Sequence, residues 1–268
     1  MKKTRLYSAA GILAIPVLSM TINFAAPSKK TAPGADPKPT IVLVHGAFAD
    51  GSSWDKVIPL LQQKGYEVIA VQNPLTSLAD DVAFTERAIA EASGPVVLVG
   101  HSWGGAVITQ AGNKEKVRSL VYVAAYAPDK GQSILDLDKE AYEVRKIPRV
   151  PGLADPVITD GYIRLKEDAV IKHFAQDLPE NEARIIAAGQ GRFHVSTLDA
   201  KVTDAAWKSK PSFYIVSDQD HIISPLLETD LAKNIKATTY HLPASHVVML
   251  SRPQEVAKII LTAAGDKQ

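Results

Sequence analysis

The sequence contains no cysteine. This absence excludes disulfide bonds, cysteine-ligated zinc sites, iron–sulfur clusters and thiol catalysis. The chain also lacks an excess of charge of either sign, because 30 basic residues stand against 29 acidic ones, and it has no polybasic stretch. A role in nucleic-acid binding therefore has no electrostatic support.

The hydrophobic fraction is 46% over 268 residues, which is ordinary for a globular protein. A chain of this length and composition buries a sizeable core, so disorder is excluded for most of it. The length suits one large α/β domain or two small domains.

The N-terminus has the composition of a secretory signal peptide. Lys2, Lys3 and Arg5 precede an uncharged stretch whose apolar centre, residues 9–20, is interrupted by Pro16. A membrane-spanning helix needs about 20 apolar residues, so this short run favours cleavage and export over a retained anchor. We expect a signal peptide over residues 1–26, a proline-rich linker over 27–39 and a domain over 40–268. The expected location is periplasmic or secreted, without stable membrane association after cleavage.

Strand and helix patterns alternate along the body of the chain. Runs of residues typical of buried strands predict strands at residues 40–44, 67–71, 96–99, 117–124, 212–216 and 238–242. Helical spacing predicts helices near residues 54–61, 77–92 and 102–110, and a last helix that begins near Pro253. This alternation indicates a mostly parallel sheet with helices on both faces, a three-layer α/β fold.

The alternation stops between about residues 128 and 207. Helical patterns occur near residues 166–176 and 180–188, and no strand is expected there. A stretch of this length is too long for an ordinary loop. We therefore predict a helical cap inserted over one end of the sheet.

Residues 100–104 read Gly-His-Ser-Trp-Gly, the pattern G-x-S-x-G. The pattern alone is weakly specific, but a strand leads into it and a helix leads out of it, which is the setting that this motif requires. A sharp turn there exposes the Ser102 hydroxyl at a helix N-terminus, where N–H groups favour negative charge. The alternative is a capping serine beside glycines that only serve packing.

A serine hydroxyl needs a neighbouring base to become nucleophilic. Of the seven histidines, His246 lies just after the last predicted strand and before the last helix, at the same end of the sheet as Ser102. A structural capping role is its alternative. The others are less well placed, in turns, strands, the insertion or on the polar surface: His45, His101, His173, His194, His221 and His241.

The imidazole in turn needs a carboxylate that fixes its tautomer. Asp218 and Asp220 both follow the predicted strand 212–216. Asp220 is favoured because the loop after it would turn back over the sheet. The order along the chain is then Ser102, Asp220, His246, a known order for such a triad.

An oxyanion hole should combine the N–H of Trp103 with one from the loop that follows the first strand. Ala47 is the first choice in that loop and Phe48 the second, because Gly46 allows a close backbone approach. The side chains of Trp103, Phe48 and Tyr126 would either line an apolar substrate pocket or belong to the core.

Four segments together resemble the α/β-hydrolase superfamily: VLVHGAFADGSSW, VLVGHSWGG, SDQDHIISP and ASHVVMLSRPQEV. Within it the chain is similar to the plant methylesterase and hydroxynitrile lyase group and to its bacterial esterase relatives, over residues 40–128 and 208–265. The resemblance implies Ser102 as nucleophile, Asp220 as acid, His246 as base, Ala47 and Trp103 as oxyanion donors, and a cap over the site.

Two departures from the lyases of that group favour hydrolysis. The lyases carry a lysine where this chain has Val247, and the lyases lack the glycine found here at position 46. Relatives with an aspartate nucleophile are disfavoured by Ser102. The sequence thus predicts hydrolysis of a small-molecule carboxylic ester through an acyl-enzyme, with no cofactor or metal. A lactonase, perhydrolase, amidase, C–C hydrolase or non-catalytic ligand binder stays possible, and the ester and oligomeric state are open.

Overall fold

The computed structural model describes residues 37–266. The predicted signal peptide and most of the predicted linker lie outside these residues. The main sheet is six-stranded in the order β2-β1-β3-β4-β8-β9, and all neighbouring strands are parallel. Its strands are β1 (Thr40–Val44), β2 (Val68–Val71), β3 (Val96–His101), β4 (Val117–Val123), β8 (Ser212–Ser217) and β9 (Thr238–Leu242).

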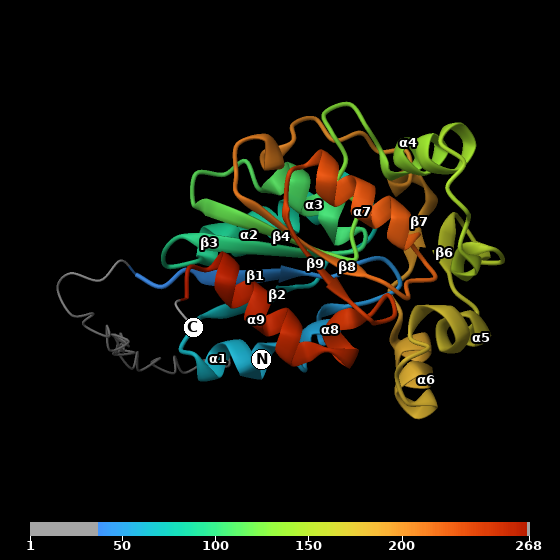
Figure 1. Cartoon of the computed structure of the whole chain (residues 1–268), viewed down its shortest axis with the longest axis horizontal. Helices are drawn as coiled ribbons and strands as arrows, with labels where there is room; N and C mark the ends of the chain where they lie inside the picture. The colour runs from blue at the N-terminus through green and yellow to red at the C-terminus, as the bar shows by residue number, and fades with distance from the viewer. Residues whose placement is uncertain (1–36, 267–268) are drawn as a thin grey trace, which may run out of the picture. The chain divides into compact units, whose positions relative to one another are not determined.

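Helices cover both faces of this sheet (Figure 1), which confirms the predicted three-layer α/β architecture. Helices α2, α3 and α7 pack on one face, and α1 and α9 pack on the other. Their bounds are α1 (Ile58–Gln63), α2 (Leu78–Glu91), α3 (Gly104–Ala111), α7 (Pro225–Asn234) and α9 (Pro253–Ala263), with α8 (Val248–Ser251) just before α9.

The central strands are apolar at nearly every position because both faces of the sheet are covered. Every residue of β1 and of β3 is buried. In the register of the sheet Val44 pairs with Gly100, so β1 and β3 end at the same level. Ser217 likewise pairs with Leu242 at the ends of β8 and β9. The loops that follow these four strands therefore leave the sheet at one edge, where the predicted site residues lie.

Two helix starts differ from the predictions for local backbone reasons. Helix α3 begins at Gly104 and not at Ser102, because Ser102 has φ of +53°, which an α-helix cannot contain. The helix predicted at 54–61 is divided into a 3₁₀ turn, η1 (Gly51–Trp54), and α1. Pro59 lies in the first turn of α1, the position that a helix allows to proline.

The segment between β4 and β8 forms the predicted cap, but the expectation of no strand there was wrong. A small antiparallel sheet of order β5-β6-β7 lies within it. These strands have only two or three residues, too few for alternation to show in the sequence. The cap contains α4 (Ile134–Lys139), η2 (Glu140–Val144), η3 (Pro151–Leu153), β5 (Val157–Thr159), β6 (Tyr162–Arg164), α5 (Glu167–Ala169), η4 (Val170–Phe174), α6 (Glu180–Gly189), β7 (Phe193–His194), η5 (Val195–Thr197) and η6 (Ala206–Lys208).

Within residues 37–266, none of the helices combines the length and the apolar character that crossing a membrane requires.

Candidate active site

Ser102 occupies the sharp turn between β3 and α3. Its φ of +53° is a left-handed conformation that side chains rarely adopt, and its neighbours hold it there. A Cβ at Gly100 would lie 2.5 Å from the carbonyl oxygen of Gly104, and a Cβ at Gly104 would lie 2.6 Å from that of Val44. The two glycines of the motif are therefore required by close backbone packing around the serine.

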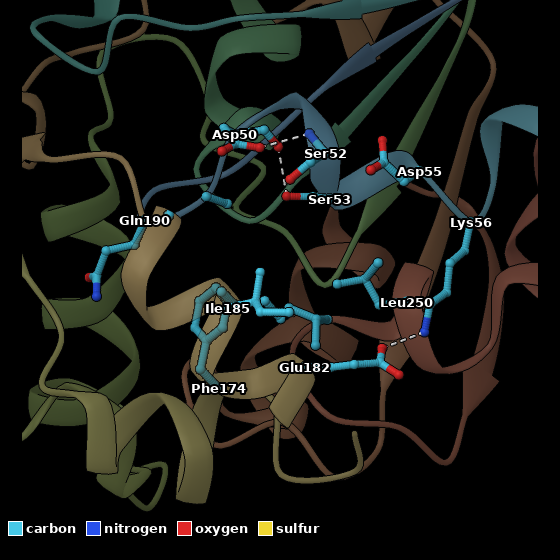
Figure 2. A pocket seen from close by; sticks show the side chains of 14 residues that line it. Asp50, Ser52, Ser53, Asp55, Lys56, Phe174, Glu182, Ile185, Gln190 and Leu250 are labelled. Atoms are coloured by element: carbon cyan, nitrogen blue, oxygen red, sulfur yellow. Dashed lines mark hydrogen bonds and ion pairs between the residues drawn. The ribbon is translucent and has the colours of Figure 1, made fainter. Parts of the chain in front are cut away.

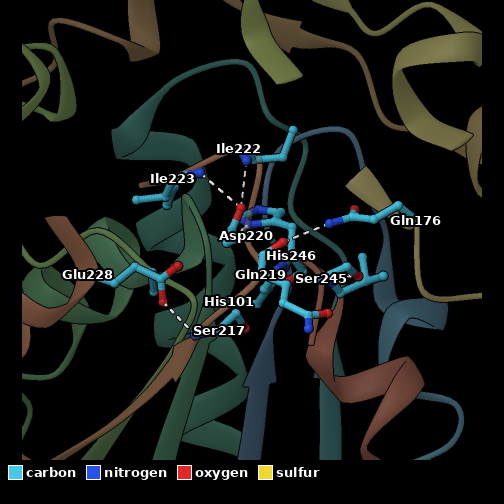
Figure 3. Close-up of polar contacts among 12 residues, drawn as sticks. His101, Gln176, Ser217, Gln219, Asp220, Ile222, Ile223, Glu228, Ser245 and His246 are labelled. Carbon is cyan, nitrogen blue, oxygen red and sulfur yellow. Dashed lines mark hydrogen bonds and ion pairs between the residues drawn. The ribbon is translucent and has the colours of Figure 1, made fainter. Parts of the chain in front are cut away.

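Asp220 and His246 meet in the interior beside the ends of β8 and β9 (Figure 3). Oδ2 of Asp220 lies 2.5 Å from Nδ1 of His246, and both side chains are 0% exposed. Oδ1 of Asp220 accepts hydrogen bonds from the amides of Ile222 at 2.6 Å and Ile223 at 3.0 Å. Because the carboxylate accepts the Nδ1 proton, Nε2 of His246 is left as the basic nitrogen. Nε2 is buried and has no hydrogen-bond partner in the described part of the chain.

The alternative acid, Asp218, lies elsewhere. Its carboxylate contacts Nδ1 of His241 at 2.8 Å, and both side chains are close to half exposed. The structure thus brings Asp220, and not Asp218, to His246.

His101 joins the turn of Ser102 to the loop of His246. Its Nε2 donates to the carbonyl oxygen of His246 at 2.9 Å, and the two rings lie 4.7 Å apart between centroids. Burial lowers the pKa of His101 well below the usual value, so the ring is neutral and serves as a hydrogen-bond donor. The sequence gives no sign of this contact across the fold, and His101 was weighed there only as a base.

The loop after β1 runs directly against the serine. A Cβ at Gly46 would lie 2.7 Å from Cβ of Ser102, so only glycine permits this approach. The next two residues, Ala47 and Phe48, form a tight turn in which Phe48 has φ of +59°. Across residues 37–266, the N–H groups of Ala47, Phe48 and Trp103 donate no hydrogen bond. Three unpaired backbone donors are thus present in the segments that flank Ser102.

His45 fixes the start of this loop. Its Nε2 accepts from the amide of Asn73 at 2.9 Å, so Nδ1 carries the proton and donates to the carbonyl oxygen of Gly46 at 2.8 Å. Burial lowers the pKa of His45, which keeps the imidazole neutral in this bridging role. The turn position of His45 was predicted from the sequence, but this bridging role was not.

The side chains of Trp103, Phe48 and Tyr126 are buried in the core. The rings of Trp103 and Phe48 both pack edge-on against Phe193 of the cap. The indole N–H of Trp103 donates to Asp81 at 2.7 Å, and burial raises the pKa of that carboxyl to about 6. Of the two interpretations of these side chains, the structure supports core packing.

A pocket of about 370 Å³ opens between cap helix α6 and the segments η1 and α8 (Figure 2). Figure 2 shows Phe174, Ile185 and Leu250 on its apolar side. The exposed ion pair of Lys56 with Glu182, 2.7 Å long, connects the core to α6 at this pocket. Its lining residues are Ala49, Asp50, Ser52, Ser53, Asp55, Lys56, Phe174, Glu182, Ile185, Ile186, Gly189, Gln190, Val247 and Leu250.

The cap contacts both loops that carry the buried pair. Phe174 packs edge-on against the imidazole of His246, with ring centroids 5.1 Å apart. Asp177 accepts the amide of Ser245 at 2.8 Å, and Gln176 donates to the carbonyl oxygen of Gln219 at 2.7 Å. The short segment 174–177 therefore connects the cap to the residues that precede Asp220 and His246.

In the described residues, no three histidine or acidic side chains are grouped so that they could hold a metal ion. The candidate site combines a strained serine, a buried histidine–carboxylate pair and unpaired backbone donors, and within residues 37–266 Nε2 of His246 forms no hydrogen bond with Ser102. Such a set is suited to nucleophilic attack on a carbonyl carbon.

A sequence profile of the alpha/beta hydrolase family matches residues 41–259. The chain belongs to the alpha/beta hydrolase family. Among its relatives, this hydrolase is 26% identical to the Pyrethroid hydrolase of Sphingobium wenxiniae over 246 residues, or 82% of this chain and 85% of the relative. It is 27% identical to Methylesterase 8 of Arabidopsis thaliana over 205 residues, or 70% of this chain and 74% of the relative. These relatives confirm the predicted family resemblance.

The fold of this alpha/beta hydrolase is also similar to that of a solved structure, polyneuridine aldehyde esterase. The TM-score is 0.73 at 21% identity, over 84% of this chain and 99% of the other. The likeness confirms the fold.

Proposed function

We propose that this chain is a serine hydrolase that cleaves carboxylic esters through an acyl-enzyme, with Ser102 as nucleophile, His246 as base and Asp220 as the orienting acid. The observation that carries the proposal is the buried hydrogen bond between Asp220 and Nδ1 of His246, 2.5 Å long. It leaves Nε2, a buried nitrogen with no partner among residues 37–266, as the atom that accepts a proton.

In the first half of the proposed reaction Nε2 of His246 takes the Ser102 hydroxyl proton while Oγ attacks the ester carbonyl carbon. The tetrahedral intermediate then collapses, the ester C–O bond breaks, and His246 returns the proton to the departing alcohol. In the second half a water molecule attacks the acyl-serine, gives its proton to His246, and the acid is released as Ser102 is reprotonated. Asp220 stabilises the imidazolium in both halves.

The developing oxyanion is assigned to backbone donors on either side of Ser102. The unpaired N–H groups of Ala47 and Trp103 are first choice, with Phe48 as the alternative to Ala47. The approach of Gly46 to Ser102 supports this assignment, because it brings the β1 loop against the serine. Loss of one such donor typically lowers the rate by about 10²–10³-fold.

The pocket beside α6 is proposed to hold the larger apolar part of a small-molecule ester. Neither Ser102 nor His246 is among its lining residues, but Val247, which follows His246, and Phe174, which packs on the imidazole, both line it. Its apolar side is formed by Ala49, Phe174, Ile185, Ile186, Val247 and Leu250, and the rest of the lining is mostly polar or charged, a mixture that suits an ester with an apolar part. The names of the relatives, a pyrethroid hydrolase and a methylesterase, agree with an ester substrate here.

The test is a series of p-nitrophenyl esters of increasing acyl length, assayed with wild type, S102A and S196A. Ser196 lies exposed in the cap and serves as the matched serine control. S102A is expected to lose about 10³-fold or more in kcat/KM, and S196A to keep the wild-type value. Equal activity of wild type and S102A would contradict the proposal.

A parallel panel of lactones, aryl amides, a peracid assay with hydrogen peroxide and C–C cleavage substrates separates ester hydrolysis from the other chemistries open to the same triad. If one of these substrate classes were turned over faster than every ester, and the turnover depended on Ser102, that class would become the assigned substrate. The proposed triad would be unaffected. No Ser102-dependent turnover of any class would favour a ligand-binding protein.

A further inference from the structure

The carboxyl of Glu228 lies buried behind the proposed triad. Glu228 stands in the first turn of α7, and its side chain is 0% exposed. A glutamate is almost never buried completely unless partners compensate it. Within residues 37–266 this carboxyl forms no ion pair, and its interactions include Ser217, Asp218 and Asp220.

One carboxyl oxygen of Glu228 accepts a hydrogen bond, and the other does not. Oε2 accepts the backbone amide of Ser217, the last residue of β8, at 3.0 Å. Oε1 is buried and receives no hydrogen bond from a donor in the described structure. The carboxyl also lies in hydrogen-bonding contact with that of Asp220, and Figure 3 draws the two in the same cluster.

Two carboxyl groups in such contact cannot both be ionised without strong repulsion. Burial, followed by the charge of Asp220, raises the pKa of Glu228 well above its usual value. Burial and repulsion thus both favour the protonated form of Glu228, and an acid O–H is the only donor that this side chain has.

The acceptor positions of Asp220 are consistent with this arrangement. Its Oδ2 faces His246, and its Oδ1 receives the amides of Ile222 and Ile223. A carboxylate offers about four lone-pair positions, so one remains for a further donor. A proton on Glu228 fills it.

We propose that Glu228 is a positioning residue: in its neutral form it donates a hydrogen bond to Asp220 and accepts one from Ser217, and so holds the carboxylate against His246. The inference rests on the proposed triad. Glu228 touches no substrate, and it acts on the reaction through the orientation and basicity of Asp220. The hydrogen bond also takes up part of the negative charge that Asp220 presents to His246.

Within residues 37–266, the titratable side chains that interact with Glu228 include Asp220, Asp218 and Tyr214. Burial keeps the pKa of Tyr214 well above its usual value, so the phenol is neutral throughout the assay range. Asp218 is near the surface, where it contacts His241. A change in the pH–rate profile on substitution of Glu228 can therefore be assigned to the pair of Asp220 with His246.

The test compares E228Q and E228L with wild type. Glutamine reproduces both hydrogen bonds, because its amide NH₂ donates to Asp220 and its carbonyl accepts from Ser217, and it leaves the net charge unchanged if Glu228 is neutral. E228Q is expected to keep kcat within about threefold and to leave the ascending limb of the pH–rate profile in place. Leucine removes both bonds, so E228L is expected to lower kcat about 10–100-fold with little change in KM and to move that limb to higher pH.

D230L is the matched control, because Asp230 lies on the same helix and forms an exposed ion pair with Arg145. It is expected to have wild-type kinetics. If E228L does not fold, E228Q alone decides the question: a downward shift of the limb by more than about half a pH unit would mean that glutamine had removed a negative charge, which overturns the proposal. Wild-type kcat and pH profile in a folded E228L would overturn it as well.

A second readout separates this inference from the proposed function. The Nδ1 proton in the hydrogen bond of His246 with Asp220 should give a low-field proton resonance in the resting protein, identified by its loss in H246A. We expect this resonance to persist in E228Q and to shift or broaden in E228L. An unchanged resonance in E228L refutes the positioning role. This readout needs no turnover, so it is independent of the outcome of the S102A assay that tests the proposed function.

Discussion

Asp220 and His246 stand 26 residues apart, on the loops after the neighbouring strands β8 and β9, and their side chains form a fully buried hydrogen bond of 2.5 Å. Such a bond fixes the imidazole tautomer and stabilises the imidazolium when the ring accepts a proton. The arrangement makes the roles of the two carboxylates that follow β8 experimentally separable.

D220N keeps the size of the side chain but removes the charge that orients His246. We expect kcat on an activated ester to fall about 10²–10⁴-fold, with the fold retained. The matched variant D218N changes a contact with the surface residue His241, away from His246, and should have wild-type kcat. Steady-state kinetics of both variants provide the measurement, and equal losses in the two would argue against the assignment of Asp220.

Gly46 is where the β1 loop approaches Ser102. In G46A the new Cβ would lie 2.7 Å from Cβ of Ser102, so the loop or the serine must move. We expect a lower Tm and a loss of kcat/KM on the order of 10²-fold, because small displacements at the reacting atoms have such effects. G94A is the control, since a Cβ there has only ordinary contacts at 3.9 Å. The proposed oxyanion loop would be in doubt if G46A and G94A behaved alike.

Asp138 gives an unusual pH dependence of stability. Burial raises its pKa to about 6, and it accepts a hydrogen bond from the hydroxyl of Tyr126 at 2.9 Å. The folded protein therefore binds this proton more tightly than the unfolded chain, whose pKa is near 3.8. The ionised carboxyl destabilises the fold above about pH 6, and this effect disappears as the pH falls from 6 towards 4. Relative to D138N, wild type should gain on the order of 2 kcal/mol of stability over that range.

The neighbouring Asp136 should show the opposite sign. A hydrogen bond from Lys201 lowers its pKa, so its contribution to stability is present above pH 3.8 and is lost below it. Urea unfolding of wild type, D138N and D136N from pH 3 to pH 7 measures both effects. For each variant the difference in free energy of unfolding from wild type is plotted against pH. If this difference had the same slope for D138N and for D136N, the assignment of a raised pKa to the buried Asp138 would be wrong.

Leu250 tests the pocket beside α6. L250W should fill part of the 370 Å³ space, so kcat/KM for long-chain p-nitrophenyl esters should fall about tenfold while that for the acetate changes little. I158W is the control, because Ile158 is 60% exposed on β5 and lies outside the pocket. Uniform loss across all chain lengths would indicate damage to the site and not a change in substrate space.

The local residue pattern of the sequence was sufficient to predict the strands of the main sheet and their order along the chain. The strands at residues 40–44 and 238–242 were predicted with the bounds that the structure has. Buried β-branched runs mark parallel strands clearly, and the order of loops after them brings Ser102, Asp220 and His246 to one edge of the sheet. The assignment of a signal peptide to residues 1–26 stays a prediction.

Tertiary contacts could not be predicted in this way. Nothing in the sequence around His45 or His101 signals that each ring bridges to a distant backbone group. Glu228 occupies an ordinary first-turn position in a helix, and only the folded chain brings it to Asp220. The cap strands escaped prediction because segments of two or three residues carry no measurable periodicity.

Covalent labelling with a fluorophosphonate, followed by peptide mass mapping, determines whether Ser102 is the nucleophile. We expect one adduct per chain, located on Ser102, absent in S102A and formed much more slowly in H246A. An adduct on another residue, or none on a folded wild-type protein that hydrolyses esters, would contradict it.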